Sequence, residues 1–326
     1  MLVRSWKTNT SFLIGAAIGR LCPEYKLRLL RSWVLHERFT AIDRFLFPAV
    51  MAAWAQCEYL KLDDPDEREK LKSSLMGGDN AAAWAQHYED QPIDLEQRVG
   101  RLSYREACPL LPSLDSLLCE RDEPHLVIQA GSSSGREISW LATRQIQHQY
   151  IGIDPYPEPI QLARQNHQLS NLSFLPIPAQ AIPELIGNHS RSVIVFSSGS
   201  LQYVQPEHIQ KLFIELGRRR KVELWLLEPA DASAENPLAV PGSRWRGNFS
   251  FTHNYRYYAE RAGWRTIRCE IIQPYAHDRR RKTTVHYLYA AVSGRTNLRR
   301  EGLNDMEALI SAPSGHYSRR SASIRT

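Results

Sequence analysis

The stretch from Leu126 to Asp154 constrains the fold of this chain more than any other. It reads LVIQAG, then SSSGREISWLATRQIQH, then QYIGID. An apolar run ends at Gly131, a Gly/Ser turn opens a helical pattern, and a second apolar run ends in an acid. This order predicts a strand, a tight loop, a helix and a parallel strand, a unit that commonly holds a nucleoside-containing ligand at the carboxyl ends of its strands.

The sequence downstream continues the same alternation of strands and helices. Strands alternating with helices of this length predict an α/β fold with a mostly parallel, Rossmann-like sheet covered by helices on both faces. The last two apolar runs are close enough in sequence to pair, which predicts an antiparallel last strand. The predicted helices are 159–169, 206–216 and 254–263, and the predicted strands are 172–178, 192–197, 222–228, 264–273 and 284–292.

The chain up to about residue 120 has helical periodicity and is expected to form an N-terminal helical region, a lid or cap over the substrate. Asp64 with Pro65 predicts a helix start, and Gly77-Gly78 predicts its end. In the next predicted helix, Trp84, His87 and Tyr88 are interpreted as packing residues, with a lid over the substrate as the alternative. The predicted domains are therefore 1–120, the Rossmann-like unit 121–293, and a basic, disordered tail 294–326.

Charge and cysteine content narrow the classes of partner. The 41 Lys plus Arg exceed the 35 Asp plus Glu by six, and the basic runs are short, so nucleic acid is not the expected partner. The apolar stretch from Phe12 to Ile18 is too short to span a bilayer, so no membrane association is expected. Five cysteines without paired metal-ligand spacing predict a reduced, cytoplasmic protein without a metal site. The oligomeric state cannot be read from the sequence.

The Gly/Ser turn has the chemistry of a ligand loop. Gly131 and Gly135 allow a tight turn and a close approach of the backbone, and free N-H groups there can meet a ligand. Asp154, at the end of the next strand, can accept hydrogen bonds from two ribose hydroxyls. The dinucleotide pattern G-x-G-x-x-G would need glycines where Ser133 and Arg136 stand, which disfavours hydride transfer.

From Leu126 to Val292 the order and spacing of these motifs resemble the class I S-adenosylmethionine-dependent methyltransferases. In that family the first strand ends in acid-x-G-x-G-x-G, the second ends in the ribose-binding acid, and the last strand is antiparallel. Two residues here depart from the pattern, because Gln129 stands on the acid and Ser133 on the middle glycine. The resemblance implies S-adenosyl-L-methionine as the cofactor, bound by Gln129, Gly131, Ser132, Ser133, Gly135, Asp154, Ala179, Gln180 and Ser197.

Methyl transfer from a sulfonium is an in-line displacement that depends mainly on positioning donor and acceptor. The candidate bases near strand ends are His253, Tyr203 and Glu228. The SSGSLQY segment after the fourth strand lacks the Asn/Asp-Pro-Pro-aromatic string of amino-group methyltransferases and the Pro-Cys of cytosine C5 enzymes. The resemblance therefore implies O-methylation of a small-molecule or sugar acceptor.

Two other functions stay open at the level of the sequence. A non-catalytic module could keep the fold and use the arginine-rich tail for an acidic partner or nucleic acid. A dinucleotide-dependent oxidoreductase is the weaker alternative. Binding of S-adenosylmethionine, of nucleic acid or of NADH would distinguish the three.

Overall fold

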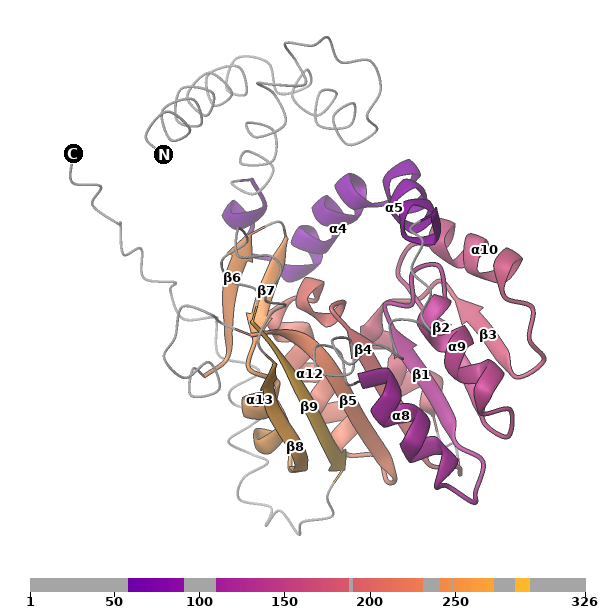
Figure 1. The fold of residues 1–326 in the computed structure, drawn as a ribbon. Helices are drawn as coiled ribbons and strands as arrows, with labels where there is room; N and C mark the ends of the chain where they lie inside the picture. The colour runs from indigo at the N-terminus through magenta and orange to yellow at the C-terminus, as the bar shows by residue number, and fades with distance from the viewer. Residues whose placement is uncertain are drawn as a thin grey trace.

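A seven-stranded sheet forms the centre of the molecule (Figure 1). The computed structural model describes residues 58–90, 110–187, 190–230, 241–247, 249–272 and 285–293. The strands of the sheet are β1 Leu126–Ala130, β2 Gln149–Ile153, β3 Leu172–Leu175, β4 Val193–Ser198, β5 Val222–Ala230, β8 Trp264–Ile272 and β9 Val285–Ser293. Their order is β3-β2-β1-β4-β5-β9-β8, and the α/β fold predicted from the sequence is thereby confirmed.

Strand directions follow the prediction as well. β1 to β5 pair in parallel, whereas β9 runs antiparallel to both β5 and β8. The chain leaves β1 toward β2 and β3 and then returns to β4 on the other side of β1. This reversal places a topological switch point at the carboxyl ends of β1 and β4, where open α/β sheets bind their ligands.

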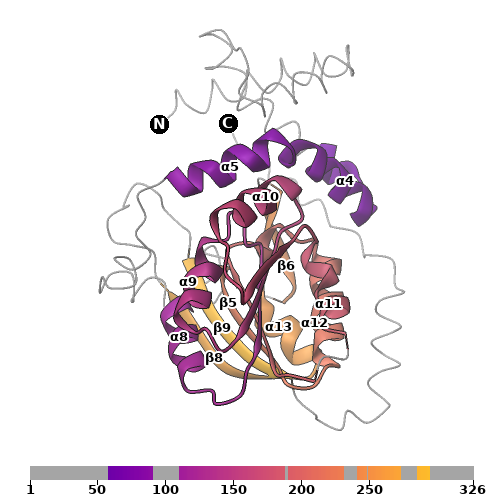
Figure 2. The same cartoon turned by 90° about the vertical axis from the view of Figure 1, so that its right-hand side faces the viewer.

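Helices cover both faces of the sheet (Figure 2). They are α8 Leu110–Cys119, α9 Arg136–Arg144, α10 Pro157–Asn166, α11 Ile182–Ile186, α12 Pro206–Gly217 and α13 Tyr255–Arg261. Successive residues of β1 point to opposite faces, so Val127 packs with Leu114 and Ile138 while Ile128 packs in the cluster that contains Phe213. The apolar runs of the strands are thus explained by burial on both faces.

Two further helices, α4 Pro65–Met76 and α5 Asp79–Asp90, lie across the carboxyl ends of the parallel strands (Figures 1 and 2). Asp64 caps α4 by accepting a hydrogen bond from the N-H of Asp66, and Gly77 ends it, as predicted. The packing interpretation of the next helix is wrong for Trp84, whose exposed fraction is 65%. α5 buries the small side chains of Ala81 and Ala85 instead.

A short antiparallel hairpin was not predicted from the sequence. It consists of β6 Ser243–Gly247 and β7 Ser250–His253, and it lies between β5 and α13 in the chain. β6 reads SRWRG, so Trp245 is its single large apolar side chain and no apolar run or alternation marks the strand. The part of the predicted helical region before residue 58 and the predicted disordered tail 294–326 lie outside the described residues.

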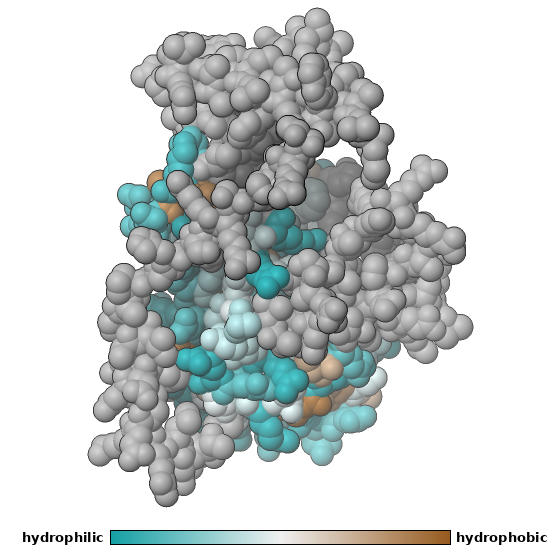
Figure 3. Space-filling model, turned by 90° about the vertical axis from the view of Figure 1, so that its left-hand side faces the viewer, coloured by the Kyte–Doolittle hydropathy of each residue, from teal (hydrophilic) through white to brown (hydrophobic). Residues whose placement is uncertain are grey.

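The surface of the described residues that Figure 3 shows is mostly hydrophilic, with small hydrophobic patches. Among these residues, no helix combines the length and the apolar character needed to cross a membrane.

Candidate active site

The loop between β1 and α9 has an unusual backbone. Gly131, Ser133 and Gly135 all have positive φ, at 72°, 48° and 86°. A side chain at residue 131 would overlap Ser200, and a Cβ at residue 135 would lie 2.6 Å from the ring of Phe174. Both glycines are therefore required by conformation and by packing, whereas Ser133 holds a left-handed conformation at a cost of about 1 kcal/mol.

Asp154 ties this loop to the end of β2. One carboxylate oxygen accepts a hydrogen bond from the N-H of Ser133 and the other from the N-H of Tyr156, both at 3.1 Å. Burial raises the pKa of Asp154 to about 6, and the two N-H donors oppose that shift. Each carboxylate oxygen can accept a second hydrogen bond, so two hydroxyl groups of a ligand can still be bound.

Several buried polar atoms of the loop have no hydrogen-bond partner among the described residues: Gln129 Oε1, Ser132 Oγ, Ser133 Oγ and Ser134 Oγ. Buried groups of this kind are rare in folded proteins because each costs about 1–3 kcal/mol. A polar ligand bound against the loop would satisfy them. The loop therefore fits the polar end of a nucleoside-containing cofactor, as its sequence predicts.

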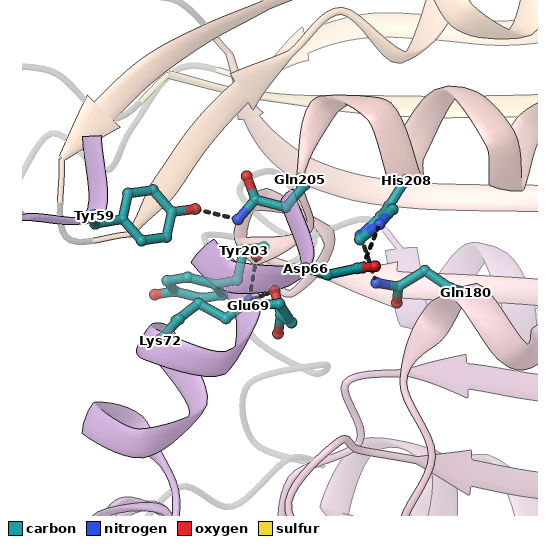
Figure 4. Close-up of polar contacts among 8 residues, drawn as sticks. All are labelled: Tyr59, Asp66, Glu69, Lys72, Gln180, Tyr203, Gln205 and His208. Carbon is teal, nitrogen blue, oxygen red and sulfur yellow. Dashed lines mark hydrogen bonds and ion pairs between the residues drawn. The ribbon is translucent and has the colours of Figure 1, made fainter. Parts of the chain in front are cut away.

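The segment after β3 holds Ala179 and Gln180, two of the residues that the family resemblance places at the cofactor. Ala179 begins the 3-10 helix η1 Ala179–Ala181 and is buried, while Gln180 Nε2 donates to His208 Nδ1 over 3.0 Å. With Nδ1 accepting, Nε2 of the His208 ring carries the proton and lies 3.6 Å from the carboxylate of Asp66 (Figure 4). The Gln180 side chain is thus directed to α12 and α4.

Ser197 and Glu228 meet inside the sheet at the ends of β4 and β5. The Ser197 hydroxyl donates to Glu228 over 2.7 Å, and neither residue is exposed. Glu228 also accepts from the N-H groups of Ser200, Leu201 and Gln202 at 3.1, 3.1 and 3.3 Å. Burial raises the pKa of Glu228 to about 7, against these donors. Glu228 thus organises the 3-10 helix η2 Leu201–Tyr203.

The other two candidate bases lie in η2 or contact its backbone. Tyr203 ends η2, is 39% exposed, and has a raised pKa because of burial. His253, at the end of β7, is 2% exposed and contacts the backbone of Leu201 and Val204, and its Nδ1 lies 2.6 Å from the Ser243 hydroxyl. Burial lowers the pKa of His253 to about 3. The structure therefore gathers all three candidates around η2, and the role of each stays a prediction.

Sequence reasoning missed the residues that the N-terminal region contributes (Figure 4). Lys72 is 6% exposed, and its Nζ donates to Glu69 at 2.6 Å and to the carbonyl of Tyr203 at 2.8 Å. The hydroxyl of Tyr59 accepts a hydrogen bond from Gln205. In the sequence DEREKLKSS, Lys72 cannot be told from lysines of a solvated helix face.

The cap formed by Tyr59 and α4 therefore reaches the loops after three successive strands. Ser73 hydrogen-bonds Tyr156 after β2, Asp66 lies beside His208, which holds Gln180 after β3, and Lys72 binds Tyr203 after β4. Within the described ranges, no group of three or more His, Cys, Asp or Glu side chains is placed to hold a metal ion.

Comparisons with known proteins find similarity to methyltransferases. A protein-family model described as "Methyltransferase domain" matches residues 127–222. No curated protein matches the chain significantly. Similar solved structures include a Burkholderia thailandensis 1,6-didemethyltoxoflavin-N1-methyltransferase, at 16% identity and a TM-score of 0.47, covering 71% of this chain and 90% of that one. Another is the magnesium protoporphyrin IX methyltransferase of Synechocystis, at 16% identity and a TM-score of 0.46, covering 69% of this chain and 100% of that one.

The family match covers β1 to the start of β5, which includes the Gly/Ser loop, Asp154, η1 and η2. Residues 127–222 therefore match the model of a methyltransferase domain, and the sheet around them has the mostly parallel order with an antiparallel last strand that the resemblance to class I S-adenosylmethionine-dependent methyltransferases implies.

Proposed function

We propose that this protein transfers the methyl group of S-adenosylmethionine to a hydroxyl group of a small-molecule or sugar acceptor. The observation that carries the proposal is the Gly/Ser loop, whose buried polar atoms lack partners within the described part of the chain and whose backbone is tied to Asp154. The cap of α4 over the same edge supports an enclosed site, from which water is excluded during transfer. We propose that the helical region up to about residue 120 is this cap and that residues 121–293 are the catalytic domain.

The cofactor supplies an activated methyl group when it is bound. Gln129, Gly131, Ser132, Ser133 and Gly135 would surround its amino acid end. Asp154 would accept hydrogen bonds from the ribose hydroxyls. Ala179 and Gln180 would contact the adenine, and Ser197 would shape the floor of the site, since its hydroxyl already binds Glu228.

The acceptor is proposed to lie beside η2. Tyr203 is the candidate with the most exposed side chain, and its raised pKa keeps the phenol protonated at neutral pH. A phenol in that state can hold the acceptor oxygen by a hydrogen bond in line with the methyl group. Glu228 and His253 both contact the backbone of η2, and we propose one of them as the group that takes up the acceptor proton.

Titration calorimetry with S-adenosylmethionine and S-adenosylhomocysteine tests the cofactor site. We expect both ligands to bind the wild type, Asp154→Asn to weaken both by about tenfold or more, and the exposed Asp63→Asn to leave both unchanged. Absence of binding of either ligand to the wild type at high micromolar concentration would overturn the proposal. A change in NADH fluorescence would instead support the oxidoreductase.

The acceptor class is tested with methyl-labelled S-adenosylmethionine and a panel of phenols, sugars, amines and carboxylic acids. Label in hydroxyl groups supports O-methylation, whereas label in amines alone contradicts it. A non-catalytic binding module is the second candidate, because η2 engages both His253 and Glu228. It predicts binding of S-adenosylhomocysteine without label in any member of the panel.

A further inference from the structure

The structure assigns the α-amino group of the cofactor to a pair formed by Gln129 and Glu137, with Glu137 supplying the negative charge. This inference rests on the proposed function and specifies one part of its cofactor site. Gln129 is uncharged, so an ammonium group beside it would need its counter-charge from another residue. Glu137, in the first turn of α9, is that residue.

The amide of Gln129 is held in one orientation. Its Nε2 donates to Glu137 Oε2 over 2.7 Å. An ionised carboxylate only accepts hydrogen bonds, so the amide nitrogen has to face Glu137 and the amide oxygen has to face away from it. Gln129 is 2% exposed, and its Oε1 has no partner among the described residues. The buried Oε1 of Gln129, next to the Glu137 carboxylate, can therefore accept a hydrogen bond from a ligand.

The charges in this unit allow few other assignments. Between Leu126 and Asp154 the sequence contains two acids, Glu137 and Asp154 itself. Asp154 is engaged by the N-H groups of Ser133 and Tyr156 at the end of β2. Glu137 lies at the amino end of a nine-residue helix, where the macrodipole favours the ionised carboxylate. Of the two acids in this stretch, Glu137 is therefore the one that can meet a cation on the α9 side of the loop.

A purely structural role explains the pair less well. If the Gln129 amide served only to hold Glu137, its Oε1 would stay buried without a hydrogen-bond partner. The hydroxyls of Ser132, Ser133 and Ser134 also lack a hydrogen-bond partner among the described residues. A primary ammonium carries three donors and no acceptor. It complements the Glu137 carboxylate and the Gln129 carbonyl together, which a hydroxyl with its single donor cannot do.

Calorimetry with two ligands separates this role from a general loss of the site. S-adenosylhomocysteine carries the amino group, whereas 5′-methylthioadenosine keeps the adenosine and the sulfur but lacks the amino acid end. We expect Glu137→Gln to weaken S-adenosylhomocysteine by about tenfold and to change 5′-methylthioadenosine by less than about twofold. Glu215→Gln makes the same charge change on α12, on the opposite face of the sheet, and is expected to alter neither.

The exchanged pair provides the sharpest comparison. The double variant Gln129→Glu with Glu137→Gln moves the negative charge from α9 to β1 and keeps an amide next to a carboxylate. Its affinity for S-adenosylhomocysteine is expected to recover from the loss in Glu137→Gln to within about threefold of the wild type. Equal losses for the two ligands in Glu137→Gln, or no loss for either, would overturn the inference. If the wild type binds S-adenosylhomocysteine and Asp154→Asn weakens it, the proposed function stands even when the inference fails. If the wild type binds no adenosyl ligand, both fail.

Discussion

The hydroxyl of Ser197, at the end of β4, donates a hydrogen bond of 2.7 Å to the carboxylate of Glu228, at the end of β5. This buried pair holds η2 in place, because Glu228 also accepts three backbone hydrogen bonds from Ser200, Leu201 and Gln202. The position of Tyr203 thus depends on a residue 25 positions later in the chain.

Replacement of Glu228 by Gln is expected to destabilise the fold by about 2–4 kcal/mol, because an amide group would face backbone donors with a donor of its own. Ser197→Ala removes one hydrogen bond and is expected to cost about 1 kcal/mol. Denaturant unfolding of the two variants measures the difference. Equal stability of wild type and Glu228→Gln would show that the carboxylate is not needed to hold η2.

Gly135→Ala is expected to destabilise the protein more than Gly187→Ala. Both residues have positive φ, 86° and 52°, but an added Cβ meets the Phe174 ring at 2.6 Å in the first case and an oxygen at 3.5 Å in the second. Conformational strain alone costs about 1 kcal/mol, and the clash is expected to add about 1–3 kcal/mol. Thermal unfolding checks this order, and equal losses would contradict the packing role of Gly135.

Binding of S-adenosylhomocysteine is expected to tighten as pH rises through about 6, because ionised Asp154 accepts ligand hydroxyls better than the protonated acid does. The affinity should level off above this range. Calorimetry at successive pH values should find no such rise in Asp154→Asn. The folding stability of the ligand-free protein depends on pH in the opposite direction. Folding raises the pKa of Asp154 from 3.8 to about 6, so the contribution of Asp154 to the free energy of unfolding falls as pH rises from 3.8 toward 6.

His253 is expected to make the fold sensitive to acid. Its pKa falls from 6.5 to about 3 on folding, so the stability from the neutral ring is full above 6.5 and is lost as pH falls toward 3. The slope for one proton is about 1.4 kcal/mol per pH unit. The free energy of unfolding of the wild type should therefore approach that of His253→Gln as pH falls from 6.5 toward 3. A constant difference would mean that the ring titrates normally in the folded protein.

Lys72→Met is expected to loosen the cap without unfolding the sheet. It removes a buried ammonium that joins Glu69 to the carbonyl of Tyr203, so amide hydrogens of α4 should exchange faster while those of α12 stay protected. Lys61→Met is the control, because the Lys61 side chain is 68% exposed. Unchanged exchange in α4 would show that other contacts hold the cap.

The order of strands and helices could be predicted from the sequence because each element of the sheet has its own signal. Apolar runs such as LVIQA mark buried strands, and Asp154 follows the second of them. The prediction also identified the two glycines of the loop, whose positive φ the structure confirms.

Other features depend on contacts between distant parts of the chain and have no local signal. Nothing near Lys72 indicates that it is buried against Tyr203, 131 residues later. Gln129 could be recognised as a departure from the family pattern, but its hydrogen bond to Glu137 follows from the turn of the loop and the start of α9. The hairpin of β6 and β7 was missed because SRWRG contains one large apolar side chain, which is too few to show the alternation of a strand.

The contacts of α4 have a consequence for any attempt to express the sheet alone. A fragment that begins at the boundary suggested by the sequence, near residue 121, would lack the partners of Gln205, of His208 and of the Tyr203 carbonyl. Those groups would face water, and the loops after β2, β3 and β4 would lose their shared support. The segment from Tyr59 to Gly77 thus packs as part of the same structural unit as the sheet, although about 50 residues of chain separate it from the first strand.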